Sequence, residues 1–167
     1  MYIKLPKKLS PSDKSGCLMS LPAKSKIILN SNITEISNYL FKSYTGTIIA
    51  EEDVINTDNI INPIRLDNLS YLGKEAFYNA SGLKVVSFEL PNTLKFGGIL
   101  GEDNSYCSSL TFGHSGDIGG SMELSDEVEE NQKIWGAKNI TVYGSDNVKT
   151  FVNTYFDTTD TQSLVTN

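Results

Sequence analysis

The chain has 167 residues, 39% of them hydrophobic, and a formal net charge of −6 at pH 7. This length suits one domain with a substantial core. The acidic balance argues against nucleic acid as the main partner, because phosphate binding requires a basic surface. No apolar run in the sequence reaches the length of a transmembrane helix, so we expect no membrane insertion. The first residues are not followed by an apolar stretch, and no secretory signal peptide is predicted.

Residues 1–26 are rich in Lys, Ser and Pro and show little periodicity. We predict an arm that docks either on its own domain or on a neighbouring subunit. The reason is that the first edge of a domain built of stacked units exposes apolar surface, which must be covered. The candidate partner contacts in this arm are Tyr2, Lys7, Lys8 and Leu18.

Residues 27–49 form a first structural unit in this interpretation. Its apolar residues predict a short strand at 27–29, with Ile33 and Ile36 facing inward after it. The acidic, Asn-rich residues 50–63 are then expected to be an inserted surface loop.

Residues 69–91 are the stretch around which the rest of the chain is organised. Two short apolar segments flank a compact turn at 76–80, and residues 86–90 alternate between apolar and other side chains, which is strand spacing. A unit of this size cannot bury its own apolar face, so it needs stacked neighbours.

Two further copies of this unit are visible in the sequence. A copy displaced by 36 residues toward the N-terminus places Ile36 on Leu72. A copy displaced by 27 residues toward the C-terminus places Ile99 on Leu72 and Leu110 on Leu83. The copy toward the C-terminus has Asp103-Asn104 where the central unit has Ala76-Phe77, so it lacks the apolar anchor of the turn.

The next segments are less regular. Glycines concentrate in residues 97–120, where they permit tight turns. Residues 121–133 are acidic and predict a solvated loop or a short helix. Ile134 and Trp135 are expected to insert back into the core.

The C-terminal part predicts a strand and then a helix. Residues 140–143 alternate as a strand does, and the apolar residues of 148–155 have the i, i+3, i+4, i+7 spacing of an amphipathic end helix. Residues 157–167 have little to bury and are interpreted as a polar tail.

The pattern Leu-x-x-Leu-Gly-x-x-Ala-Phe-x-x-Ala-x-x-Leu at 69–83 resembles the BspA-type leucine-rich repeat. Residues 106–110 are similar to the same element in its Cys form, and residues 140–151 resemble the strand, turn and capping helix with which such arrays often finish. The resemblance covers roughly residues 27–156. It implies an α/β fold, namely a short irregular leucine-rich-repeat solenoid with small parallel strands, loops and a C-terminal capping helix.

Catalytic machinery is not evident in the sequence. Residues 113–117 resemble a nucleophile elbow, but Gly-x-Ser-x-Gly requires glycine where Asp117 stands. A serine hydrolase also needs a separate base, whereas His114 is the only histidine of the chain and adjoins Ser115. We therefore interpret this segment as a Gly-rich turn and do not expect an enzyme.

Metal and cofactor sites are not predicted either. One histidine and the separated Cys17 and Cys107 do not make a zinc site, and two free thiols are favoured over a disulfide. Residues 102–104 and 157–160 carry oxygen ligands that calcium accepts, but neither has EF-hand spacing, and solvated loops are the preferred interpretation.

These observations favour a non-enzymatic structural or protein-binding component. Tyr78 joins the candidate partner contacts, because tyrosine buries a large area with little loss of entropy. We expect the partners to be other protein subunits in a homo- or hetero-oligomeric assembly. The specific expectation is a bacteriophage virion, in which the chain is tail- or baseplate-associated and could bind a cell-surface receptor. The alternative is a secreted or surface-attached bacterial adhesion protein.

Overall fold

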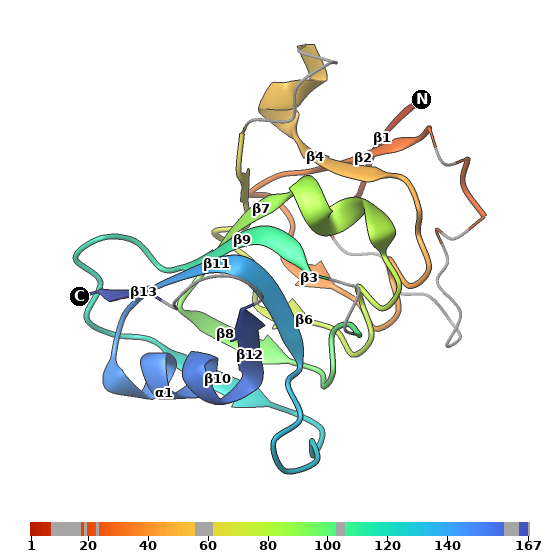
Figure 1. The fold of residues 1–167 in the computed structure, drawn as a ribbon. Coiled ribbons are helices and arrows are strands. Elements are labelled where there is room, and N and C mark those ends of the chain that lie inside the picture. The colour runs from red at the N-terminus through yellow and green to blue at the C-terminus, as the bar shows by residue number, and fades with distance from the viewer. Residues whose placement is uncertain are drawn as a thin grey trace.

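The computed structural model describes residues 1–7, 18, 20–22, 24–55, 62–102, 106–158 and 164–166. The described strands form three sheets (Figure 1). The first has the order β1 (Tyr2–Lys4), β2 (Lys26–Leu29), β4 (Thr47–Ala50). The second has the order β10 (Ser121–Leu124), β8 (Thr93–Phe96), β6 (Tyr71–Leu72), β3 (Glu35–Ile36). The third has the order β12 (Phe156–Thr158), β11 (Trp135–Tyr143), β9 (Cys107–Phe112), β7 (Ser87–Leu90), β5 (Ile64–Arg65), with β13 (Leu164–Thr166) also on β11.

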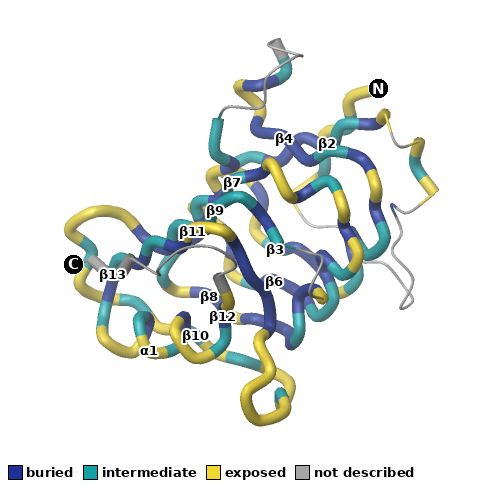
Figure 2. Tube along the Cα trace, in the orientation of Figure 1, coloured by how far each residue is buried: buried dark blue, intermediate teal, exposed yellow. Residues whose placement is uncertain are grey.

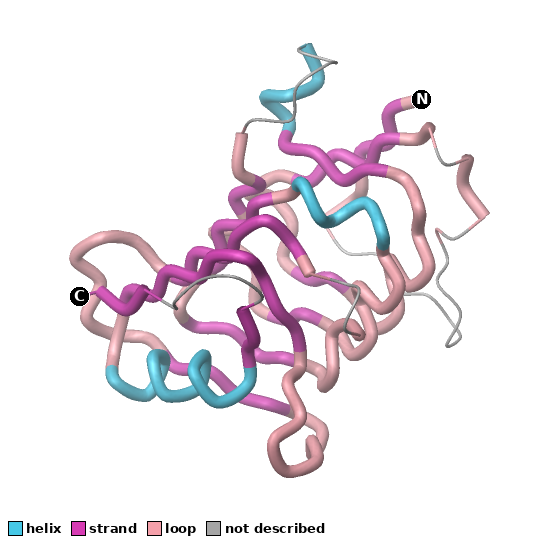
Figure 3. The backbone as a smooth tube through the Cα atoms, viewed as in Figure 1, coloured by secondary structure: helices cyan, strands magenta, loops and turns pink. Residues whose placement is uncertain are grey.

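Helical segments lie outside these sheets (Figure 3). They are the 3-10 helices η1 (Glu51–Ile55) and η2 (Ser81–Val85) and the α-helix α1 (Asp146–Tyr155). Every strand pair in the described residues is parallel. The prediction of an α/β fold with small parallel strands is therefore confirmed.

The end helix is also confirmed. The Ser145 side chain caps α1 by accepting a hydrogen bond from the backbone N–H of Val148 at 3.4 Å. Val148 and Val152 are buried on the inner side of the helix. The helix packs against β10, β11 and β12, at the end of the molecule opposite to β1, β2 and β4 (Figure 1).

The strand registers confirm the 36-residue copy and correct the 27-residue one. Ile36 pairs with Leu72, as the backward copy predicts. Leu72 pairs with Phe96, a spacing of 24 residues, so the prediction that Ile99 occupies this place is wrong. Leu110 lies in a strand opposite Phe88 and does not take the place of Leu83. Phe96 is buried in full whereas Ile99 is half-buried, so the inward position selects the register.

Two strands occupy segments for which other structures were predicted. Strand β9 lies within the Gly-rich residues 97–120, and β10 begins the acidic residues 121–133, where a loop or short helix was expected. The prediction for 121–124 is wrong because Met122 and Leu124 are partly buried and pack against the core, while the residues that alternate with them are exposed.

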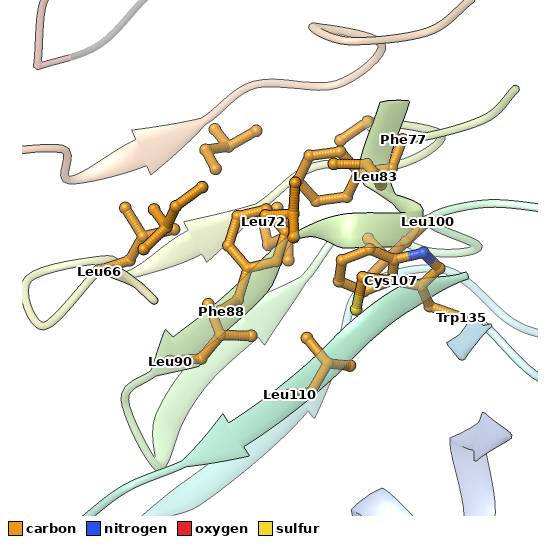
Figure 4. Packing of buried hydrophobic residues seen from close by; sticks show 14 of the residues in the cluster. Leu66, Leu72, Phe77, Leu83, Phe88, Leu90, Leu100, Cys107, Leu110 and Trp135 are labelled. Carbon is orange, nitrogen blue, oxygen red and sulfur yellow. The ribbon is translucent and has the colours of Figure 1, made fainter. Parts of the chain in front are cut away.

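Buried aromatic rings connect the stacked segments. The rings of Phe41 and Phe77 are stacked at 5.5 Å, and those of Phe77 and Trp135 at 4.7 Å. Phe88 packs against both Phe77 and Trp135 (Figure 4). The insertion of Trp135 into the core is thereby confirmed: it is 3% exposed. Buried residues lie on the strands along the middle of the molecule and also in turns such as the one that carries Phe77, whereas other connecting loops are exposed (Figure 2).

The two ends of the chain contribute strands to the sheets. Tyr2 pairs with Lys26 in the first sheet, and the carbonyl of Lys7 accepts a hydrogen bond from the N–H of Thr34 at 3.2 Å. The described start of the arm thus docks on its own chain. Within the expected polar tail, residues 157–158 and 164–166 pair with β11, which the sequence did not lead us to expect.

Replacing Phe77 by alanine should destabilise the protein strongly. Phe77 is 1% exposed and touches rings from three other segments, so Phe77→Ala should lower the free energy of unfolding by about 3–5 kcal/mol in urea titrations. Val85 is 60% exposed, and the control Val85→Ala should change the free energy of unfolding by no more than about 0.5 kcal/mol. Similar losses for the two variants would contradict the role of the aromatic stack.

Tyr44 should make stability fall at alkaline pH. Its ring is 1% exposed, its hydroxyl donates to the carbonyl of Ser25 at 2.7 Å, and burial raises the pKa of Tyr44 from 10.0 to about 12. The unfolded chain therefore loses this proton first, so the stabilisation is complete below pH 10 and is lost as the pH rises toward 12. The loss from this group reaches about 1.4 kcal/mol per pH unit.

The variant Tyr44→Phe should be less stable at neutral pH by about 1 kcal/mol, because it lacks the hydrogen bond to Ser25. Its stability should fall less steeply than that of the natural protein between pH 10 and 12, as measured by urea unfolding at several pH values. If the unfolding free energies of the two proteins fall equally steeply between pH 10 and 12, Tyr44 does not have the raised pKa that its burial implies.

Candidate functional site

A groove of about 750 Å³ opens beside the turn that carries Tyr78, where β9 and β11 begin. We call it the Tyr78 groove; the residues that line it include Tyr78, Glu102, Tyr106, Lys133, Gly136 and Asp157. The groove therefore gathers one of the predicted partner contacts with two carboxylates, a second tyrosine and a lysine.

Backbone hydrogen bonds fix the turn on one side of this groove. The N–H of Ser43 donates to the carbonyl of Tyr78 at 2.8 Å, and the N–H of Phe77 donates to the carbonyl of Leu100 at 2.8 Å. Phe77 is buried at the same time, so the neighbouring Tyr78 is held on the outer side of the turn. Its hydroxyl donates a hydrogen bond to the carboxylate of Glu102. This hydrogen bond, with desolvation as a second cause, raises the pKa of Tyr78, so the hydroxyl stays a donor over the physiological pH range.

A lysine lies next to the ring of Tyr78. The Lys42 ammonium is 5.0 Å from the centroid of the Tyr78 ring and 5.5 Å from that of Tyr39. The same ammonium lies 2.5 Å from a carboxylate oxygen of Glu75. Two aromatic rings and one carboxylate thus hold a cation at the edge of the turn.

The floor of the groove depends on a glycine. A Cβ atom on Gly136 would lie 1.8 Å from Cε1 of Tyr106 and 2.7 Å from the carbonyl oxygen of Asp157. Only glycine therefore lets the Tyr106 ring lie against the backbone of β11. The hydroxyl of Tyr106 donates to Oδ2 of Asp157 at 3.3 Å, which brings the second carboxylate to the groove.

Lys133 is engaged by the end of the helix. Its ammonium donates to the carbonyl of Thr154 at 2.8 Å and to that of Asn153 at 3.4 Å. These carbonyls belong to the last turn of α1, where a cation is favourable. In the described contacts, Lys133 therefore binds the C-terminal end of α1 and not the carboxylates of Glu102 and Asp157.

The predicted partner contacts lie in different places. Tyr2 is exposed on β1, with the Lys26 ammonium 5.7 Å from its ring centroid. Lys7 is exposed, and Leu18 is 8% exposed and packs into the core. Lys8 lies outside the described residues. Of the predicted contacts that the structure describes, the Tyr78 groove contains Tyr78 alone.

Glu102, Tyr106, Gly136 and Asp157 were not predicted as site residues. Sequence reasoning assigned Glu102 and Asp157 to solvated loops. A signal was nevertheless present for Gly136, because a glycine within a strand often marks a close approach of another group.

The turn around His114 is held by carboxylates. The backbone N–H of His114 donates to Oδ2 of Asp117 at 2.8 Å, and the N–H of Asp117 donates to the His114 carbonyl at 3.0 Å. Nε2 of His114 is 3.5 Å from Oδ1 of Asp67. These contacts describe an exposed turn.

Cys107 is a free, buried thiol. Burial raises its pKa well above the ordinary range, so it stays protonated and is not a nucleophile. Cys17 lies outside the described residues.

The described part of the chain contains neither a group of metal ligands nor a membrane-spanning helix. No cluster of three or more His, Cys, Asp or Glu side chains suited to a metal ion occurs there. None of its helices has the length and apolar character needed to span a membrane. Comparison of the chain with family models, with curated proteins and with solved structures finds no match.

The glycine at the floor of the groove can be tested by a matched pair of alanine variants. Gly136→Ala should displace Tyr106 and lower the free energy of unfolding by about 2 kcal/mol or more, because the new methyl group overlaps the ring. It should also increase acrylamide quenching of Trp135, the only tryptophan of the chain, which lines the same groove.

The control is Gly119→Ala, since a Cβ atom there would meet nothing within 4 Å. It should leave stability within about 0.5 kcal/mol of the natural protein and Trp135 quenching unchanged. If Gly136→Ala behaves like this control, Tyr106 does not lie against β11.

Proposed function

We propose that the chain is a short, irregular leucine-rich-repeat solenoid of the BspA type, acting as a non-enzymatic subunit of a large protein assembly. A bacteriophage virion, with the chain in or near the tail or baseplate, is the specific setting. The partners are other protein subunits, and a chain in this position would also meet a receptor on the surface of the host cell.

The observation that carries the proposal is the stacking of successive segments in one parallel register. Ile64, Phe88, Leu110 and Ile140 follow one another across the third sheet as paired residues, and all four are buried. A column of apolar residues at equivalent places is what a repeat architecture requires, because each unit buries its neighbour's apolar face.

The same register supports a binding role. Ser87 pairs with Ser109, and Ser109 pairs with Asn139, so a row of half-buried and exposed polar residues crosses β7, β9 and β11. Stacked parallel strands hold these side chains at fixed separations. Such a surface is suited to contact with another protein, since little conformational entropy is lost when it binds.

The two ends of the stacked segments further support a role as a subunit of an assembly. At one end α1 covers the last strands, and Met122, Leu124, Phe151 and Tyr155 are partly buried against the core there. At the other end β1 forms the edge of the first sheet, with Tyr2 and Lys4 exposed. An edge strand with charged and aromatic side chains avoids uncontrolled pairing and still offers a defined contact.

Sedimentation tests this function directly. Lysate of the cells that naturally produce the protein would be separated on a density gradient, with the chain detected by antibody and by mass spectrometry. We expect the chain in fractions of large particles, together with other particle proteins, and retained after a high-salt wash.

Other distributions would overturn the virion proposal. Recovery in the soluble fraction at the mass of a monomer would exclude a stable assembly. Recovery on washed cell surfaces, without particles, would favour the surface-adhesion alternative.

A further inference from the structure

The Tyr78 groove contains the parts of a cation-binding site. Glu102 and Asp157 supply carboxylates, and Tyr78 and Tyr106 supply aromatic rings beside them. The cation among the described lining residues, Lys133, donates to carbonyls of α1 instead. The groove therefore offers more negative charge than its own described lysine neutralises.

The neighbouring turn shows how this chemistry holds an ammonium group. Lys42 lies 5.5 Å and 5.0 Å from the ring centroids of Tyr39 and Tyr78, with a carboxylate oxygen of Glu75 at 2.5 Å. The ring of Tyr78 thus already takes part in one cation–π contact, and its hydroxyl extends from that contact to Glu102. Rings and carboxylates recur in the groove, where Tyr106 and Asp157 complete the set.

The tyrosine hydroxyls orient the two carboxylates. Each hydroxyl donates one hydrogen bond, to Glu102 or to Asp157, and a carboxylate has about four acceptor sites on its two oxygens. Each carboxylate is therefore positioned by a tyrosine and keeps acceptor capacity for a ligand. Beyond them Gly136 contributes no side chain, and the ring of Tyr106 lies against its backbone and forms the floor there.

We propose that the Tyr78 groove binds the ammonium or guanidinium group of a lysine or arginine side chain presented by a protein partner. This inference rests on the proposed function and deepens it, because it names the chemistry by which the subunit recognises its neighbour. A volume of about 750 Å³ accommodates such a side chain with the backbone on either side of it.

A basic side chain fits better than a saccharide. Sugar rings stack on exposed aromatic faces, but Trp135 is 3% exposed and its ring is already stacked on Phe77 at 4.7 Å. Sugar hydroxyls also use donors and acceptors together, whereas the tyrosine hydroxyls of the groove already donate to carboxylates. What remains are acceptors with negative charge, which suit a group that only donates.

Titration of the isolated full chain with small peptides tests the site. The probe is acetyl-Gly-Lys-Gly-amide, and the matched probe acetyl-Gly-norleucine-Gly-amide has a similar side chain without the charge. Binding is followed by NMR shifts of groove amides and by Trp135 fluorescence; maltotriose is titrated in parallel. We expect saturable shifts with the lysine peptide, weakened by salt, and binding of the norleucine peptide at least about tenfold weaker.

Variants distinguish the effect of the two groove carboxylates on binding from the effect of the overall charge of the protein. Glu102→Gln and Asp157→Asn should each weaken binding of the lysine peptide about fivefold. Glu123→Gln removes the same charge from an exposed position on β10 and should leave binding within about twofold of the natural protein. Circular dichroism confirms that each variant is folded.

Several results would overturn the site: no saturable shift with the lysine peptide, equal binding of the norleucine peptide, saturable binding of maltotriose alone, or equal losses for Glu123→Gln and Glu102→Gln. Because the titration uses the isolated chain, it is independent of sedimentation with particles. A chain that sediments with particles but does not bind the lysine peptide refutes the groove alone. A chain that binds the peptide but never enters a particle refutes the assembly alone.

Discussion

The stack of Phe41, Phe77 and Trp135 is the interaction on which the remaining structure depends. Paired strands are separated by 36 residues between β3 and β6 but by 24 between β6 and β8, so chain length alone does not align successive segments. Large planar rings at 5.5 Å and 4.7 Å give these segments a common reference. Extra residues are then accommodated outside the stack, as η1 is (Figure 1).

Sequence alone identified the elements whose pattern is local. The turn around Phe77, the 36-residue copy and the helix of Val148 and Val152 follow from spacing and residue type, and the structure contains them. The register of the 27-residue copy was predicted wrongly for a different reason. Phe96 and Ile99 are both apolar and three residues apart, so the sequence offered two registers, and only burial in the assembled core distinguishes them.

The candidate site could be predicted only in part. Tyr78 stood out because tyrosine buries a large area with little loss of entropy, which favours it at interfaces. Glu102 and Asp157 come from segments that meet only when β9, β11 and β12 are side by side, and no spacing between them marks this. Nor does any spacing announce that the ring stacked on Phe77 is that of Trp135, which belongs to a later strand.

Stacking also explains why a groove occurs at this place. Parallel register brings surface side chains of successive segments into contact, and here the contacts run from the Lys42 ammonium to the Tyr78 ring and from its hydroxyl to Glu102. Along this series each side chain contacts the side chain of the next segment, the Lys42 ammonium the Tyr78 ring and the Tyr78 hydroxyl the Glu102 carboxylate. At Gly136 the side chain is missing, and the segment that follows contributes Asp157 instead of a cation. The lysine of the groove, Lys133, donates to carbonyls of α1, so the carboxylates of Glu102 and Asp157 keep acceptor capacity that the proposed lysine or arginine of a partner would use.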